Sequence, residues 1–221
     1  MHIEVKWFKI IYDDFAKFTK YQERLISVDG FDYVEGSLIL KNSHVDSFFS
    51  PSNESIISSL TSKKRDFLLL RSSQELQVIF KVVNINSGLI FTKDATISDF
   101  LNRVRDEEVL LQSLGLGLWE VPHLWLNLFV PRSTISDFNQ GFLVDIISKE
   151  SLTTGPFLIY PINRKGWDAR MSVAIPEEED DDMFYTVALL NSAGPAVDPS
   201  VIDKQNNRIL EFCDKARIYI K

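Results

Sequence analysis

Few residues of this 221-residue chain have the types and spacing that catalysis or metal binding requires. The histidines, His2, His44 and His123, stand in no paired spacing such as HExxH, so a His-based metal site has nothing to be built from. The single cysteine, Cys213, excludes an intramolecular disulfide and a Cys-based zinc cluster. A serine-hydrolase elbow and a Walker loop are absent, and the GLG at 115–117 is a fragment of a dinucleotide fingerprint that follows a helix instead of a strand. We therefore expect no metal site and no catalytic group of these kinds.

The segment around Trp125 is the best candidate for binding a ligand. In a strand, alternation places Trp125, Asn127 and Phe129 on one face and the intervening leucines on the other. A tryptophan gives a flat apolar surface, and an asparagine beside it offers both a hydrogen-bond donor and an acceptor. This combination suits a planar heteroaromatic ligand. The alternative is structural, with Trp125 packed in a core and Asn127 capping a backbone group.

Carboxylates at two other places are candidates for contacting a ligand amine. The apolar stripe of an expected helix places Glu108 near its middle and Glu107 at its edge, so one of them should face the interior. Tyr33 and Glu35 share a strand face, where an inward carboxylate needs hydrogen bonds or a cation. The alternative is an acid that reaches solvent. The acidic run at 177–182 lacks the spaced ligands of a calcium loop, and we expect a solvated surface loop there.

Strands and helices alternate along the chain. Strands are expected at Ile3–Tyr12, Phe31–Leu40, Leu118–Pro131, Gly155–Tyr160 and Met183–Leu190. Helices are expected to begin at caps provided by Asp13 or Asp14, Thr96 or Ser98, Ser133, and Asp198. The predicted fold is an α+β layer, in which helices pack on one face of a mostly antiparallel sheet and residues 1–221 form one domain.

Four segments give weaker signals. Gly36 interrupts its strand and suggests a bulge or a close backbone approach. The short apolar runs Phe67–Leu70 and Val78–Val83 fit a buried strand or a buried helix equally well. Ala216–Lys221 has the composition of a new strand that stops abruptly, from which we expect the chain to be a piece of a longer protein.

Composition limits the classes of partner. Hydrophobic residues make up 45% of the chain, enough for a sizeable core without disulfides or metals. Lys and Arg total 24 against 31 Asp and Glu, and the net charge of −7 argues against a nucleic-acid partner. No apolar run approaches the ~20 residues of a membrane span, and Met1–Phe8 shows no signal-peptide pattern, so we expect no membrane partner. The compartment stays unknown.

Several motifs, in this order along the chain, resemble the plant cytokinin dehydrogenase (cytokinin oxidase) family. They are Phe31–Gly36, Ser47–Pro51, Phe100–Val104, Leu118–His123 followed by Trp125–Pro131, Gly155–Pro161 with Trp167 and Asp168, and Asn207–Cys213. The resemblance implies an FAD-dependent oxidoreductase that cleaves the side chain of N6-isoprenoid adenines to adenine and an aldehyde. It also implies an α+β substrate-binding domain, an FAD domain formed by both chain ends, and mostly monomeric enzymes. Family members are commonly secreted or vacuolar, and some are cytosolic.

By this resemblance the chain is the cytokinin-binding domain, cut at both ends. The Gly-His-Ser motif that attaches FAD has no counterpart, because His44 stands in Ser-His-Val. We therefore expect no catalytic and no cofactor-binding residue in this chain, with FAD held by the absent part. Substrate recognition is the expected role, and the alternative is an inactive remnant that at most binds purines weakly.

The resemblance also assigns site residues and departures from the family pattern. Glu107 matches a carboxylate at the pocket mouth, Trp125 and Asn127 match positions near the adenine, and Glu35 and Tyr160 match cavity-lining positions. For the inward acid the helix periodicity favours Glu108 and the resemblance favours Glu107, which we adopt. Leu124 replaces a proline usual in the family, which frees a backbone N–H and is expected to loosen the turn before Trp125. Leu114–Leu118 carries two residues more than usual.

Overall fold

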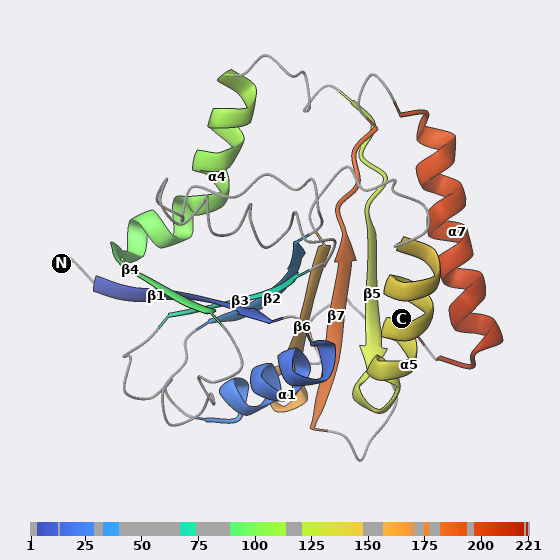
Figure 1. The fold of residues 1–221 in the computed structure, drawn as a ribbon, viewed down its shortest axis with the longest axis horizontal. Helices are drawn as coiled ribbons and strands as arrows, with labels where there is room; N and C mark the ends of the chain where they lie inside the picture. Colours follow the sequence, from blue (N-terminus) through green and yellow to red (C-terminus); the bar gives the residue numbers. More distant parts are fainter. Residues whose placement is uncertain are drawn as a thin grey trace. The chain divides into compact units, whose positions relative to one another are not determined.

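The computed structural model describes most of the strands and helices of the chain (Figure 1). The described residues are 4–12, 14–28, 33–39, 67–73, 89–113, 121–147, 157–168, 170, 175–176, 182–193, 197–218 and 220. The chain divides into two units, Met1–Glu120 and Val121–Lys221, and each is described by itself.

Antiparallel strands form the sheet of the N-terminal unit. Its strands are β1 (Glu4–Tyr12), β2 (Val34–Ile39), β3 (Phe67–Ser73) and β4 (Leu89–Thr96), and its helices are α1 (Phe15–Ile26) and α4 (Ile97–Ser113). The strand order is β4-β1-β3-β2, with every pairing antiparallel. The apolar run at 67–70, whose type the sequence leaves open, is part of strand β3. Strand β4 was not predicted, and the run at 78–83 lies outside the described residues.

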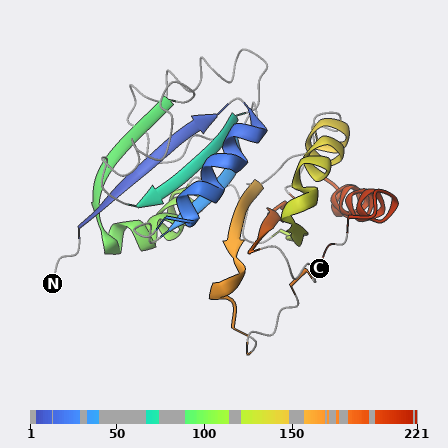
Figure 2. The same cartoon turned by 90° about the horizontal axis from the view of Figure 1, so that it is seen from below.

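Helices α1 and α4 cover opposite faces of this sheet. Tyr12 of β1 meets Phe18 of α1 with ring centroids 6.3 Å apart, whereas Trp7 of β1 meets Phe100 of α4 at 5.4 Å. Tyr12 follows Trp7 by five positions, an odd step, so the two side chains point to opposite faces of the strand. Figure 1 shows the two helices on opposite sides, and Figure 2, seen from below, shows α1 in front of the strands.

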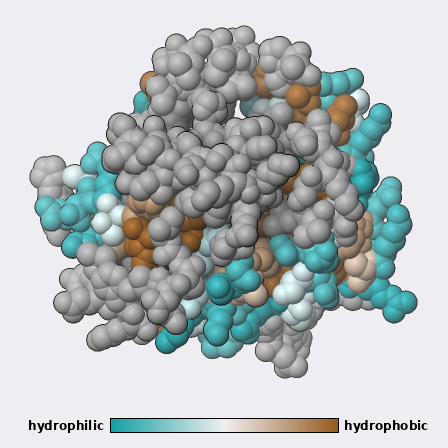
Figure 3. Space-filling model, viewed as in Figure 1, coloured by the Kyte–Doolittle hydropathy of each residue, from teal (hydrophilic) through white to brown (hydrophobic). Residues whose placement is uncertain are grey.

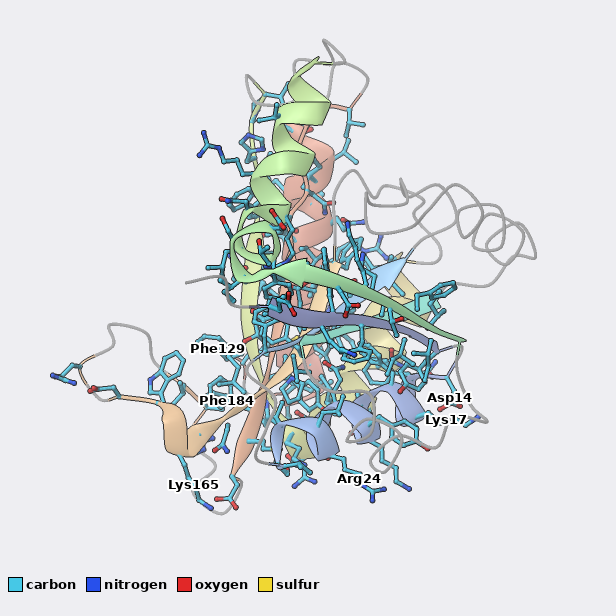
Figure 4. All side chains as sticks on the ribbon, turned by 90° about the vertical axis from the view of Figure 1, so that its left-hand side faces the viewer. Asp14, Lys17, Arg24, Phe129, Lys165 and Phe184 are labelled. Carbon is cyan, nitrogen blue, oxygen red and sulfur yellow. The ribbon has the colours of Figure 1, made fainter. Side chains whose placement is uncertain are left out.

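The helix starts in this unit confirm the predicted caps. Asp14 accepts a hydrogen bond from the Lys17 backbone N–H at 2.7 Å, and Figure 4 labels both residues at the start of α1. Thr96 and Asp99 cap α4 reciprocally: the Asp99 N–H donates to the Thr96 hydroxyl at 3.1 Å, and the Thr96 N–H donates to the Asp99 carboxylate at 3.2 Å. Each N-terminus is therefore occupied by an aspartate carboxylate.

The C-terminal unit has three antiparallel strands in the order β6-β7-β5. Its strands are β5 (Leu126–Pro131), β6 (Phe157–Asn163) and β7 (Met183–Leu189). Its helical segments are η2 (Arg132–Thr134), α5 (Ile135–Asn139), the π-helix η3 (Gln140–Ile147), η4 (Arg164–Gly166) and α7 (Pro199–Lys215).

One face of this three-stranded sheet is buried beneath helices. Phe157 of β6 meets Phe142 of η3 with ring centroids 6.0 Å apart, so the face of Phe157 is the helix-covered one. The stripe predicted for the helix after Pro131 is buried in full, at Ile135, Phe138, Phe142 and Ile146. The outer side of α7 is mostly hydrophilic (Figure 3). The α+β class, the antiparallel sheet and the helix-covered face are as predicted, whereas the described helices of the N-terminal unit lie on both faces of its sheet.

Several predicted details are corrected by the structure. Of the strand expected at Leu118–Pro131, residues 118–120 lie outside the described residues, and the described part is a strand only from Leu126 onward. The helix after it is preceded by Thr134, not Ser133, and no side chain caps it. The register of β2 on β3 runs without interruption through Gly36, so there is no bulge.

The end of α7 also differs from the prediction. The Arg217 N–H donates to the Asp214 carbonyl and the Ile218 N–H to the Cys213 carbonyl, while Arg217 has a φ of 56°. These two bonds and the left-handed residue define a Schellman motif. Ala216–Ile218 therefore ends a helix instead of starting a strand. Asp198 caps the other end of α7, as predicted, by accepting from the Ser200 N–H at 2.8 Å.

Candidate functional site

The face of the β6-β7-β5 sheet opposite the helices gathers Trp125, Asn127 and Tyr160, three of the five predicted ligand-binding residues. Directly opposed residues of antiparallel strands share a face. The register therefore aligns two rows, Asn127–Ala188–Leu158 and Phe129–Thr186–Tyr160. Trp125 continues the same alternation just before β5 begins. We call the seven residues named here the open face.

The exposure of side chains confirms the alternation predicted for this segment. Trp125 is 52% exposed and Asn127 is also exposed, whereas Leu128 and Val130 are buried on the helix side. Trp125 is thus not a core residue. The structure brings Trp125, Asn127 and Tyr160 together on one face, where a planar ligand could stack and form hydrogen bonds.

Aromatic rings close one end of the open face. Phe129 meets Phe184 edge to face with centroids 5.1 Å apart, and Trp167 meets each of them at 5.7 Å. Figure 4 shows Phe129 and Phe184 side by side. Phe184 is fully buried, so this end offers the partly exposed rings of Phe129 and Trp167 to a ligand, while the Asn127 end offers polar groups.

Thr186 lies between Phe129 and Tyr160 in the second row and was not predicted. Its residue is 9% exposed, and its hydroxyl has no hydrogen-bond partner among the described residues. The signal for it is weak in the sequence, a single polar residue in an otherwise apolar strand.

The turn before Trp125 is tied to the segment at 191–193. The Leu124 N–H donates to the Asn191 carbonyl at 3.0 Å, and the Ala193 N–H donates to the Pro122 carbonyl at 2.8 Å. The expectation that Leu124 loosens this turn was wrong, because the N–H that a proline would lack forms one of these bonds. Beside it, His123 Nδ1 lies 2.7 Å from Ser192 Oγ, and the His123 ring lies 5.6 Å from that of Trp125.

Glu35 belongs to the N-terminal unit, where it is buried in a polar cluster. The Tyr33 hydroxyl donates to Glu35 Oε2, and Arg103 Nη2 lies 3.5 Å from the same oxygen. The side chains of Arg103 and Glu35 are only 10% and 11% exposed. Arg103 also donates to the Phe100 carbonyl at 2.8 Å and to the Tyr33 hydroxyl at 2.8 Å. These contacts fix the orientation of the Glu35 carboxylate.

Arg103 was missed in the sequence, although the need for a cation near Glu35 was recognised. Its guanidinium lies 4.4 Å from the centroid of the Phe100 ring, a cation–π contact that holds it over the sheet. Glu107 follows Arg103 by one helical turn in α4. The side chains of Glu107 and Glu108 lie outside the described residues, so the choice between them stays a prediction.

Other titratable groups give no sign of chemistry in the described ranges. No cluster of three His, Cys, Asp or Glu residues there could hold a metal ion. Burial raises the pKa of the Cys213 thiol to about 11, so the thiol is uncharged at neutral pH. Of the acidic run only Asp182 is described, and it forms an exposed ion pair with Lys165 at 3.2 Å. Among the described helices, none has the length and apolar content of a membrane span.

Comparison with known proteins identifies the family of this chain. A family model described as "Cytokinin dehydrogenase 1, FAD and cytokinin binding" matches residues 3–221. Cytokinin dehydrogenase 2 of Arabidopsis thaliana is 44% identical over 98% of this chain and 46% of its own length. Cytokinin dehydrogenase 5 of Oryza sativa subsp. japonica is 42% identical over 98% of this chain and 44% of its own length. The chain thus spans under half the length of these relatives.

A solved structure supports the fold. A berberine bridge enzyme variant, described as a reticuline dehydrogenase, superposes with a TM-score of 0.50 at 11% identity, over 96% of this chain and 41% of that one. At this identity the likeness concerns the fold alone. With the family model matching nearly every residue, this chain belongs to the cytokinin dehydrogenase family, in its FAD- and cytokinin-binding part.

Proposed function

We propose that this chain is the substrate-recognition part of an FAD-dependent cytokinin dehydrogenase and binds an N6-isoprenoid adenine on the open face. The observation that supports this most is the juxtaposition of an exposed tryptophan, Trp125, with Asn127 on a sheet face that the unit's helices leave uncovered. Adenine is a planar heteroaromatic ring with both donors and acceptors at its edge. An indole and an amide side by side match it.

In this proposal the two ends of the open face bind the two ends of the ligand. The adenine ring stacks on Trp125, and the Asn127 amide pairs with its edge. The partly exposed rings of Phe129 and Trp167, which pack on the buried Phe184, receive the isoprenoid side chain. Tyr160, from the neighbouring strand β6, completes the polar centre.

Glu35 and Glu107 are proposed as acidic ligand contacts in the N-terminal unit, as the family resemblance assigns them. Glu35 is supported by its fixed orientation, since Tyr33 and Arg103 both hold the carboxylate. An oriented carboxylate can accept a hydrogen bond from a ligand N–H without first losing side-chain freedom. Glu107 is supported by its position in α4, one turn after Arg103.

The described residues do not fit the pyrophosphate of FAD. Helix N-termini are the usual anion sites of nucleotide-binding proteins. Here the N-termini of α1, α4 and α7 each hold an aspartate carboxylate: Asp14, Asp99 and Asp198. A second anion would meet like charge at these places. We therefore assign recognition of the substrate, and no redox step, to the described residues.

The second candidate function is a purine-binding remnant without catalysis, which the misfit with FAD favours. Expression of the 221-residue chain tests both candidates. Calorimetric titration with isopentenyladenine should show binding, whereas the purified chain should show no flavin absorbance band and no turnover with an artificial electron acceptor. Flavin copurifying with the chain, or turnover, would refute the assignment of recognition alone. Absence of purine binding would refute both candidates.

Substitution of the open face tests the site itself. Trp125→Ala and Asn127→Ala should each weaken isopentenyladenine binding about tenfold or more, because they remove the stacking surface and the paired amide. Leu210→Ala is a matched control, since Leu210 is an exposed large apolar residue of α7, 38% exposed. Calorimetry on the three variants is the measurement, and equal affinities for Trp125→Ala and Leu210→Ala would contradict the site.

A further inference from the structure

A side chain of α7 holds the peptide group from which Trp125 projects. Asn206 Nδ2 donates a hydrogen bond to the Leu124 carbonyl at 3.2 Å. The Leu124 carbonyl and the Trp125 nitrogen belong to the same planar peptide group. The hydrogen bond from Asn206 therefore fixes the orientation of the peptide plane that precedes the Cα atom of Trp125.

The neighbouring residue of α7 anchors the other side of the same turn. Asn191 Nδ2 donates to Gln205 Oε1 at 3.2 Å, and both residues are fully buried, at 0% and 1% exposure. The Asn191 carbonyl accepts the Leu124 N–H. Both backbone polar groups of Leu124 thus depend on α7, the carbonyl directly through Asn206 and the N–H through Asn191 and Gln205.

Burial of the Asn206 amide is partly unfavourable, and the hydrogen bond that its Nδ2 donates explains why an asparagine is present at this position. Its amide oxygen is buried and has no partner among the described residues. A buried carbonyl oxygen without a partner destabilises the folded state, because it has lost its hydrogen bonds to water. The next residue, Asn207, is exposed and contacts only the same helix in the described bonds, through Asp203 at 3.2 Å. A leucine at position 206 would bury no polar atom without a partner, but it could not donate a hydrogen bond to the Leu124 carbonyl.

We propose that Asn206 is a positioning residue for ligand binding, which holds the Leu124–Trp125 peptide so that the exposed indole is already oriented on the open face. The proposal rests on the proposed function, since it concerns the presentation of Trp125 to a purine. Pre-orientation raises affinity because the indole loses less freedom on binding. Asn206 itself touches neither the ligand nor the open face in this account.

The test compares Asn206→Leu with Asn207→Leu in the full chain. The first readout needs no ligand: with 5-fluorotryptophan incorporated, the ¹⁹F resonance of Trp125 is assigned by its loss in Trp125→Phe. Asn206→Leu should shift or broaden this resonance, and Asn207→Leu should leave it unchanged. The second readout is calorimetry with isopentenyladenine, for which we expect about a tenfold loss in Asn206→Leu and none in Asn207→Leu.

A second variant guards against misfolding. Asn206→Asp keeps the size of the side chain but replaces the N–H donor by an oxygen facing the Leu124 carbonyl, so it should reproduce both effects of Asn206→Leu. An unchanged Trp125 resonance in both variants at position 206, or a changed resonance with unchanged affinity, would overturn the proposal. Equal effects at 206 and 207 would overturn it as well. If the parent chain binds no purine, the proposed function fails, while the ¹⁹F comparison still decides whether Asn206 orients Trp125.

Discussion

Thr186 and Thr19 are two buried threonines with opposite hydrogen-bonding states. The Thr19 hydroxyl of α1 donates to the carbonyls of Phe15 and Ala16 at 3.1 and 3.2 Å. The Thr186 hydroxyl of the open face has no partner among the described residues. Both residues are nearly inaccessible, at 7% and 9% exposure, so burial alone does not separate them. The difference makes Thr186 an unfavourable polar group in the unliganded sheet.

Replacement by valine should therefore have opposite consequences at these two positions. Thr186→Val should raise the free energy of unfolding by about 1 kcal/mol, because it removes an unsatisfied hydroxyl at nearly constant volume. Thr19→Val should lower it by about 1 kcal/mol, because it removes satisfied bonds. Urea unfolding of both variants is the measurement. A loss of stability in Thr186→Val would show that its hydroxyl has a partner in the folded protein.

Arg103 and Glu35 form an ion pair whose partners are about nine-tenths buried. Removing one partner of such a pair deprives the other buried charge of its ion-pair partner, which typically costs about 3 kcal/mol or more. Arg103→Met should therefore destabilise the chain by about 3 kcal/mol.

The double variant Arg103→Met/Glu35→Gln provides the control. It should lose clearly less stability than the sum of the two single variants, because the neutral amide needs no cation. Thermal and urea unfolding of the three variants supply the measurement. Additive losses would mean that the two side chains do not interact in solution.

At the scale of elements, a glycine allows α7 to approach the π-helix η3. A Cβ atom placed on Gly141 would lie 2.0 Å from an atom of the Phe212 ring. The ring would have to move away, which would disturb the contact between the two helices. The same construction on Gly166, in η4, meets no atom within 4 Å.

Replacing each of these two glycines by alanine should distinguish the effect of side-chain packing on stability from the effect of backbone conformation. Gly141→Ala should destabilise the chain by about 2 kcal/mol through overpacking, despite the better helix propensity of alanine. Gly166→Ala should change stability by less than about 0.5 kcal/mol, as surface substitutions usually do. Urea unfolding curves of the two variants make the comparison, and equal stabilities would contradict the close approach of Phe212.

The length of β5 shows where element prediction fails. The sequence from Leu118 to Pro131 has the composition of one strand, yet regular pairing begins at Leu126. Before that point, Pro122 has no N–H to donate, and only an isolated bridge joins His123 to Ser192. The composition of a segment does not show where the strand that pairs with it ends.

At the scale of the whole molecule, the chain covers under half of its relatives' length, so its activity is tested best within a complete enzyme. The chain would replace the matching segment of Arabidopsis thaliana cytokinin dehydrogenase 2, which is 46% of that protein and to which the chain is 44% identical. This chimera should contain flavin and oxidise isopentenyladenine. Trp125→Ala in the chimera should lower kcat/KM at least tenfold more than Leu210→Ala does. A flavin-containing chimera without turnover would contradict the proposed substrate.

Much of the local structure could be predicted because it depends on neighbours in the chain. Asp14, Thr96 and Asp198 cap helices through bonds that span two or three residues. The exposed side of β5 follows from alternation, which put Trp125 and Asn127 on one face before any partner strand was known. The family motifs, too, are stretches of contiguous residues. All of these features can be recognised in short segments of the sequence.

The tertiary structure alone decided what meets across distant segments. It paired Arg103 with Glu35, placed Thr186 between Phe129 and Tyr160, and joined the Leu124 N–H to the Asn191 carbonyl. None of these contacts has a local pattern, because each depends on the register of strands or on the packing of a helix. The sequence by itself therefore determined which residues could bind a planar ligand. The fold determined which of them share a surface and what holds Trp125 in place on it.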